Sequence, residues 1–184
     1  MKPSLTAALL LMLTVSGCAT VGGRGDAVGI DGEACAGHLP EAMAGLVPAD
    51  NPALLQQAQL ASGKGGTCAA KVYSVQAPMV LYRVFDSSAP FSRLGKWWSA
   101  VRPTGTVEGY RAAFAICPQW SQLDRLVSCE VRPGTQVVIG TTQSVTCPDG
   151  SVFPKTAEPQ VFVPNNGLDG IVHVGACKNE GTWP

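Results

Sequence analysis

The residues with the clearest chemical potential lie between positions 81 and 99, where one arginine interrupts an apolar segment and two tryptophans follow. Arg83 is the single charge in Met79–Phe85, and apolar residues alternate on both sides of it, which predicts a strand covered on both faces. A guanidinium in such a strand needs an anionic partner, because burying an unpaired charge is costly. That partner is either a structural carboxylate or the phosphate of a ligand, which arginine binds bidentately. A further alternative is an arginine that only caps the edge of the sheet. Of Trp97 and Trp98, one can stack on a flat ring while the other packs in the core.

Several common catalytic and metal-binding patterns are absent from the sequence. It contains no P-loop, no GxGxxG, no GxSxG and no HExxH, so the mechanisms that rest on these motifs lose their usual support. His38 and His173 are far apart and no CxxC or CxxH spacing occurs, so we expect no metal site. The chain has 13 Lys and Arg against 13 Asp and Glu, a balance that predicts no attraction to nucleic acid.

The first residues have the pattern of an export signal. Lys2 precedes an apolar run over residues 5–15, which is too short for a permanent membrane span. Val15-Ser16-Gly17-Cys18 resembles the lipobox of bacterial lipoproteins, which implies cleavage before Cys18 and lipid, including palmitate, on that cysteine. Ala19 resembles the outer-membrane sorting pattern, which implies an outer-membrane lipoprotein facing the periplasm or the exterior. An ordinary signal peptide that happens to contain a cysteine is the alternative.

After the signal peptide of residues 1–17, composition divides the chain into three parts. Residues 18–33 are rich in glycine with few large apolar side chains, which predicts a flexible tether. Residues 34–78 are expected to form a cover of helix and strand, and residues 79–184 the principal domain. The length that remains after cleavage suits one domain better than two.

Six cysteines remain beside the lipidation candidate. An even number in an exported chain predicts up to three disulfides, each stabilising the fold by about 2–4 kcal/mol. The sequence does not choose among the possible pairings. The pairing we favour joins neighbours along the chain: Cys35 with Cys68, Cys117 with Cys129, and Cys147 with Cys177.

Helix and strand patterns indicate an α+β domain. Asn51-Pro52 provides an N-cap and a first-turn proline for a helix that stops at Gly63. A second helix is predicted over residues 106–116, and a shorter one between His38 and Val47, after Pro40. Strands are predicted over residues 71–75, 79–85, 126–132, 136–140, 160–164 and 171–175, separated by turns rich in Pro, Gly and Asn. Short strands after one or two helices indicate a mainly antiparallel sheet.

Residues 79–164 resemble the toxin-type NAD glycohydrolases and their relatives with the ADP-ribosyltransferase fold, found at the C-termini of bacterial polymorphic toxins. In that group an arginine on the first core strand holds the phosphates, a Gly-aromatic-Ser segment follows, and a Gln or Glu that opens a late strand touches the ribose. Arg83, Trp98 with Ser99, and Gln160 match these positions in order. The segments that carry the resemblance are Tyr82-Arg83-Val84-Phe85, Gly95-Lys96-Trp97-Trp98-Ser99, Tyr110-Arg111, Ala115 to Gly140 and Pro159 to Pro164.

The resemblance implies an ADP-ribosyltransferase-like fold for residues 79–184 and hydrolysis of the N-glycosidic bond of NAD to nicotinamide and ADP-ribose. NAD is then a substrate, and no resident cofactor is expected. Arg83 and Gln160 are the implied catalytic residues, and Trp97, Trp98 and Ser99 the implied substrate-binding residues. Gln160 cannot act as a base, which favours water as the acceptor.

Departures from the family pattern leave two alternatives open. Gln160 stands where the transferase branch has a catalytic glutamate, and Glu158 lies two residues earlier. A histidine that some NAD glycohydrolases use has no counterpart. ADP-ribosyl transfer is therefore one alternative. The other is a non-catalytic lipoprotein of the outer membrane that binds a ligand or a protein partner.

Overall fold

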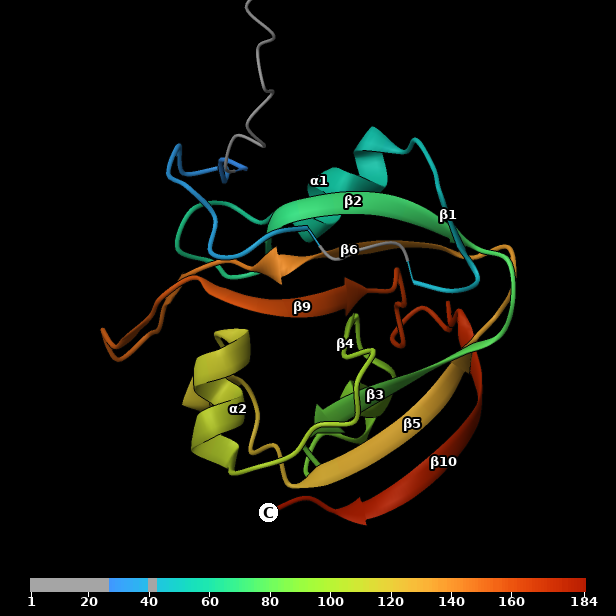
Figure 1. The fold of residues 1–184 in the computed structure, drawn as a ribbon. Coiled ribbons are helices and arrows are strands. Elements are labelled where there is room, and N and C mark those ends of the chain that lie inside the picture. The colour runs from blue at the N-terminus through green and yellow to red at the C-terminus, as the bar shows by residue number, and fades with distance from the viewer. Residues whose placement is uncertain (1–26, 40–42) are drawn as a thin grey trace, which may run out of the picture.

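The computed structural model describes residues 27–39 and 43–184, and over these ranges the chain forms two main antiparallel sheets, a separate two-stranded sheet and two α-helices (Figure 1). The larger sheet has the strand order β1-β2-β6-β9-β4 and the smaller one the order β10-β5-β3. The prediction of an α+β fold with a mainly antiparallel sheet is confirmed. The strands are β1 Leu46–Pro48, β2 Thr67–Val75, β3 Met79–Phe85, β4 Trp97–Trp98, β5 Arg125–Val131, β6 Gln136–Thr142, β9 Thr156–Phe162 and β10 Val174–Thr182.

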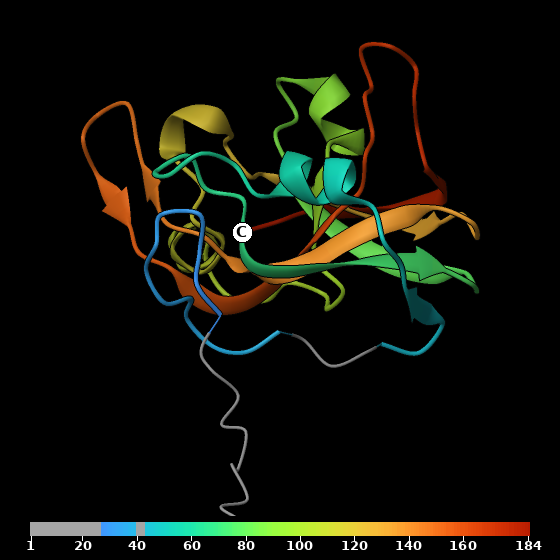
Figure 2. The same cartoon turned by 90° about the horizontal axis from the view of Figure 1, so that it is seen from above.

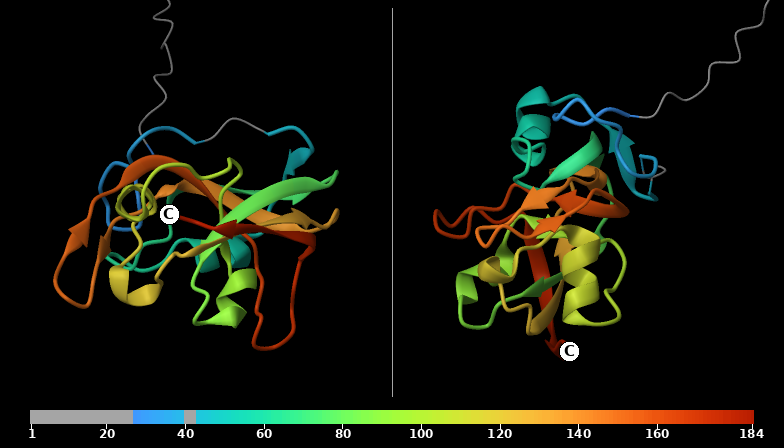
Figure 3. Two further views of the ribbon diagram at one scale, coloured as in Figure 1. Left: turned by 90° about the horizontal axis from the view of Figure 1, so that it is seen from below. Right: turned by 90° about the vertical axis from the view of Figure 1, so that its left-hand side faces the viewer.

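The remaining elements are short and lie around the sheets. Strands β7 Val145–Thr146 and β8 Val152–Phe153 form a hairpin that projects at one end of the molecule (Figure 2). Helix α1 covers the outer face of the larger sheet, and α2 lies beside β9 on the other side of that sheet (Figures 1 and 3). The helices and 3-10 turns are α1 Pro52–Ala58, η1 Pro90–Leu94, α2 Val107–Phe114 and η2 Pro118–Trp120.

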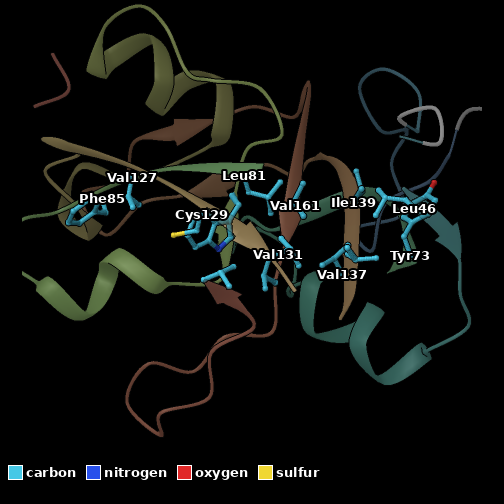
Figure 4. Close-up of a cluster of buried hydrophobic side chains, with 14 residues drawn as sticks. Leu46, Tyr73, Leu81, Phe85, Val127, Cys129, Val131, Val137, Ile139 and Val161 are labelled. Carbon is cyan, nitrogen blue, oxygen red and sulfur yellow. The ribbon is translucent and has the colours of Figure 1, made fainter. Parts of the chain in front are cut away.

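The two sheets meet where β3 approaches β4. Tyr82 N donates to Ser99 O at 2.8 Å, and Ser99 N donates to Tyr82 O at 2.8 Å. Side chains from the inner faces of both sheets fill the space between them, as Figure 4 shows for Leu81 and Val127 of the smaller sheet and Ile139 and Val161 of the larger. Because these side chains are at most 2% exposed, the hydrophobic effect holds the two sheets at a fixed distance.

Side-chain caps define where both helices begin. Asn51 Oδ1 accepts from Leu54 N at 3.0 Å, with Pro52 in the first turn of α1. Thr106 Oγ1 accepts from Gly109 N at 3.1 Å at the start of α2. Both caps, of which that of Asn51 was predicted, satisfy backbone donors that would otherwise lack partners. In the described residues no helix is long and apolar enough to cross a membrane.

Three disulfides are present, and only the first predicted pair is correct. Cys35 is bonded to Cys68. The other two predicted pairs, Cys117 with Cys129 and Cys147 with Cys177, are replaced by Cys117–Cys147 and Cys129–Cys177. The reason is strand register: a bulge in β10, between the residues that pair with Glu130 and Ser128, brings Cys177 beside Cys129 of β5. Sequence proximity carries no information about that bulge.

The N-terminal part of the described chain differs from its predictions. Instead of the helix expected after Pro40, Leu46–Pro48 forms edge strand β1; residues 40–42 lie outside the described ranges. Residues 34–78, expected to be a cover, contribute β1 and β2 to the larger sheet. Within the expected tether, residues 27–33 are attached to the domain, because Lys155 Nζ donates to Asp31 Oδ1 at 2.9 Å and to Glu33 O at 3.2 Å. The signal peptide, Cys18 and the rest of the tether lie outside the described residues.

Candidate functional site

Four of the predicted site residues line one cavity of about 350 Å³, a size within the range of small-molecule sites. They are Arg83 on β3, Trp97 and Trp98 on β4, and Gln160 on β9. Strand order explains their convergence, since β9 pairs with β4, and β4 joins β3. The other lining residues come from α2 and from two loops: Leu60, Lys64, Gly66, Val84, Tyr110, Phe114, Ala115, Ile116, Trp120, Ser121 and Leu123.

Arg83 is held by backbone carbonyl groups. Its Nε donates to Ser92 O at 2.7 Å and its Nη1 to Trp97 O at 2.6 Å. A Cβ on Gly95 would lie 2.5 Å from Arg83 Nη2, so a larger residue at this position would displace the guanidinium from its present place. None of the four ion pairs in the described residues includes Arg83. The structural-carboxylate interpretation of this arginine is therefore wrong for the described part of the chain.

The cavity is cationic and its walls are largely apolar. Lys64 and Arg83 are its charged lining residues, and within the described chain no carboxylate or imidazole lines it. Burial lowers the pKa of Arg83 to about 10, so the guanidinium stays charged at neutral pH. Burial raises the pKa of Tyr110 to about 12, so the phenol stays neutral. The result is a positive potential in an apolar surrounding, which attracts an anion with a flat or apolar part.

Gln160 is buried but keeps one free acceptor. Its Nε2 donates to Gly66 O at 2.6 Å and to Thr142 Oγ1 at 3.3 Å. These two acceptors fix the orientation of the amide. None of the described residues donates a hydrogen bond to Oε1. This oxygen is also not fully buried, because the only fully buried polar side-chain atom without a partner in the described residues is Gln143 Nε2. This oxygen is therefore available to accept a hydrogen bond from a hydroxyl donor in the cavity.

The tryptophan pair divides between core and cavity wall. Trp98 is 2% exposed, belongs to the core between the sheets, and donates from Nε1 to Gly95 O at 2.8 Å. Trp97 is less buried and packs edge-on against Phe162, with ring centroids 5.0 Å apart. Both tryptophans contribute atoms to the cavity. Of the two, Trp97 has the freer ring for contact with a ligand.

Two residues considered from the sequence lie elsewhere. Ser99 Oγ donates to Val101 O at 2.7 Å, and both Ser99 and Glu158 line a second cavity of about 220 Å³. Tyr110 and Phe114 of α2 line both cavities. The structure therefore brings neither Ser99 nor the carboxylate of Glu158 into the cavity that holds Arg83.

Among the lining residues that were not predicted as site residues are Lys64, Tyr110 and Trp120. Lys64 is exposed and follows Gly63 in a glycine-rich turn, a signal that the sequence contains. Tyr110 lies on α2 and packs against Trp183, with ring centroids 5.1 Å apart. Trp120 is 51% exposed, and nothing in the sequence distinguishes it from a surface tryptophan.

Residues 115–123 form one wall of the cavity and are fixed at several points. Arg111 donates from Nη1 to Cys117 O at 3.2 Å and from Nη2 to Ser121 O at 2.5 Å. The Cys117–Cys147 disulfide attaches the same segment to the end of β7. Asp86 Oδ2 accepts from Gln122 N at 2.9 Å. These contacts preorganise the wall in the absence of a ligand.

No group of three or more His, Cys, Asp or Glu suited to a metal ion occurs in the part of the chain that the structure describes. The chain matches no protein-family model, no curated protein and no solved structure.

Proposed function

We propose that the cavity binds a nucleotide and that the protein hydrolyses NAD to nicotinamide and ADP-ribose. The observation that carries this proposal is the convergence of Arg83, Trp97 and Gln160 on one cavity in which the guanidinium has no carboxylate partner among the described residues. An uncompensated cation in an apolar cavity is the arrangement that a phosphate completes.

Each side chain has a role in the proposed reaction. Arg83 holds a phosphate through the N–H groups that do not donate to Ser92 O or Trp97 O. Gln160 Oε1 accepts a hydrogen bond from a ribose hydroxyl, and the aromatic wall receives the nicotinamide ring. The bond between ribose C1′ and the nicotinamide nitrogen breaks through an oxocarbenium-like state. Water then bonds to C1′, and its proton passes to solvent.

Catalysis in this site rests on orientation more than on proton transfer. The cationic nicotinamide leaves as a neutral ring, so the departing group needs no protonation. Holding the diphosphate and the ribose fixes the reacting carbon relative to the attacking water. The dipole of Gln160 Oε1 stabilises the positive charge that develops on the ribose.

Binding without turnover is the second candidate, favoured by the absence of a carboxylate or imidazole among the described lining residues. ADP-ribosyl transfer has less support, because Glu158 lines the other cavity. One assay distinguishes hydrolysis, binding without turnover and ADP-ribosyl transfer. The purified oxidised protein is incubated with NAD, and nicotinamide and ADP-ribose are quantified chromatographically, with and without a protein acceptor. Hydrolysis releases both products in equal amounts; binding without release supports the second candidate, and no binding at millimolar NAD contradicts both.

We also propose that the protein is anchored by lipid on Cys18 in the outer membrane. The support is the lipobox-like Val15-Ser16-Gly17-Cys18. Cys18→Ser should move the protein from the membrane fraction to the soluble envelope fraction. Identical fractionation of the variant and the unchanged protein would contradict the anchor.

A further inference from the structure

The glycine-rich loop Gly63-Lys64-Gly65-Gly66 forms part of the cavity wall through Lys64 and Gly66. Gly63, Gly65 and Gly66 have φ values of +72°, +77° and +82°, a backbone conformation that glycine adopts without strain. At Gly66 a Cβ would lie 2.6 Å from Ala58 O. Glycine is therefore required at this position both by conformation and by space.

Backbone contacts hold this loop in place on two sides. Gly65 N donates to Ser144 O at 3.0 Å, and Thr146 N donates to Gly63 O at 2.9 Å, which attaches the loop to β7. Gly66 O accepts from Gln160 Nε2 at 2.6 Å and from Gln143 N at 2.9 Å. The loop is thus fixed relative to the proposed ribose-binding residue.

The loop also keeps donors free. Gly66 N donates no hydrogen bond to any of the described residues, and the ammonium group of Lys64 has no carboxylate partner among them. A free backbone N–H next to left-handed glycines and a lysine are the components of an anion-binding turn. Arg83, on β3 of the smaller sheet, is the second cation of the same cavity.

We propose that the Gly63–Gly66 loop is a second phosphate subsite, which makes the cavity selective for diphosphate ligands over monophosphates. Arg83 and Lys64 each take one phosphate, and Gly66 N–H donates to the phosphate held by Lys64. This inference rests on the proposed nucleotide-binding role of the cavity and specifies its ligand class. Lys64 is then a specificity-determining residue.

The test compares ADP-ribose with AMP by calorimetry, without any need for turnover. Lys64→Met should weaken ADP-ribose binding by about tenfold, the effect of losing one charge-assisted contact, and should leave AMP binding within about twofold, because a screened exposed charge acts weakly at a distance. Lys71→Met is the matched control: Lys71 is also exposed, lies on β2 and lines none of the cavities described above. Lys64→Arg should restore part of the ADP-ribose affinity.

The outcomes separate this inference from the proposed function. Suppose that the unchanged protein binds ADP-ribose. If Lys64→Met then binds ADP-ribose equally well, or loses affinity for ADP-ribose and AMP to the same extent, the subsite is refuted while the nucleotide site stands. If Lys71→Met has the same effect as Lys64→Met, the loss is one of net charge and the subsite is refuted. If the folded protein binds neither ligand, the proposed function fails, and this inference fails with it.

Discussion

Arg83 and Arg102 each line a cavity beside α2, but within the described residues only Arg102 is paired with a carboxylate. Arg102 is half exposed and donates to Glu180 Oε2 at 2.7 Å, and its cavity also contains Glu158. Arg83 is more deeply placed and donates to two backbone carbonyl oxygens instead. The deeper cation, for which a missing counter-ion costs more, is thus the one without a carboxylate among the described residues.

This difference supports the proposal that the cavity of Arg83, and not that of Arg102, binds an anion. In a surface ion pair such as Arg102–Glu180 each charge neutralises the other, and the pair contributes little to stability. An arginine that is fixed by backbone carbonyls and placed beside aromatic rings is preorganised for an anion from outside the protein. The two arginines can therefore be compared within one chain. The changes described next test the difference between them, in order of decreasing expected effect.

Replacing Arg83 should have the largest effect on ligand binding. Arg83→Met should remove the proposed bidentate phosphate contact, worth about 2–4 kcal/mol, and so weaken ADP-ribose binding by about 30-fold to 1,000-fold. Arg102→Met should leave binding within about twofold, because its charge is already paired. Calorimetric titration gives the affinities. Thermal unfolding checks the fold, and Arg83→Lys, which keeps the charge, should recover part of the binding. Equal losses in the two methionine variants would contradict the distinction.

Removing the Cys117–Cys147 disulfide should reduce both stability and affinity. Replacing both cysteines by serine should lower the free energy of unfolding by about 3 kcal/mol, as expected for a loop of this size, and should loosen the wall formed by residues 115–123. Removing Cys129–Cys177, which joins β5 to β10 away from the cavity, should reduce stability by a similar amount without a change in affinity measured well below the unfolding temperature. Equal affinity losses in both double variants would show that the wall has no specific dependence on the first bond.

Gln160→Glu should destabilise the cavity instead of converting it to a transferase site. The substitution replaces Nε2, which donates to Gly66 O at 2.6 Å, with a carboxylate oxygen that faces that carbonyl. Losing a buried donor costs about 1–3 kcal/mol, and the added negative charge opposes phosphate binding. Urea unfolding and ADP-ribose titration measure the two effects. Unchanged stability together with tighter binding would contradict the observed role of this amide.

Acidification should weaken the wall through Asp86, with the smallest effect of the series. The Ser88 hydroxyl, followed by Gln122 N–H, holds the pKa of Asp86 below its usual range. A depressed pKa stabilises the fold above the unfolded value of about 3.9, and this contribution is lost as the pH falls through the folded pKa. Asp86→Asn should therefore be less stable at pH 7 and show a shallower decline below pH 4. Parallel pH profiles of urea midpoints would contradict this role.

The local parts of this architecture could be read from the sequence. Met79–Phe85 is a strand with the predicted bounds, and Asn51 caps a helix through the predicted side chain. Both depend on neighbouring residues, for which propensity and alternation are informative. The resemblance to a known family also selected Arg83, Trp98 and Gln160. These three residues are far apart in the sequence and line one cavity.

Features that depend on register or on loop geometry could not be read in the same way. The partner of Cys129 is decided by a bulge in β10. Ser99 follows a strand of only two residues, and its backbone pairs with Tyr82 while its hydroxyl bonds to Val101. Lys64 joins the cavity because β7 holds its loop. Each outcome is set by tertiary contacts between segments far apart in the chain, which no local pattern specifies.

Titration of the oxidised, folded protein with ADP-ribose at two salt concentrations is the decisive test of the proposal that Arg83 binds an anionic ligand. We expect saturable binding that weakens as salt is raised, since charge attraction contributes to it, and that is lost in Arg83→Met but kept in Arg102→Met. Absence of binding at millimolar ADP-ribose, or equal binding by the unchanged protein and Arg83→Met, would contradict it.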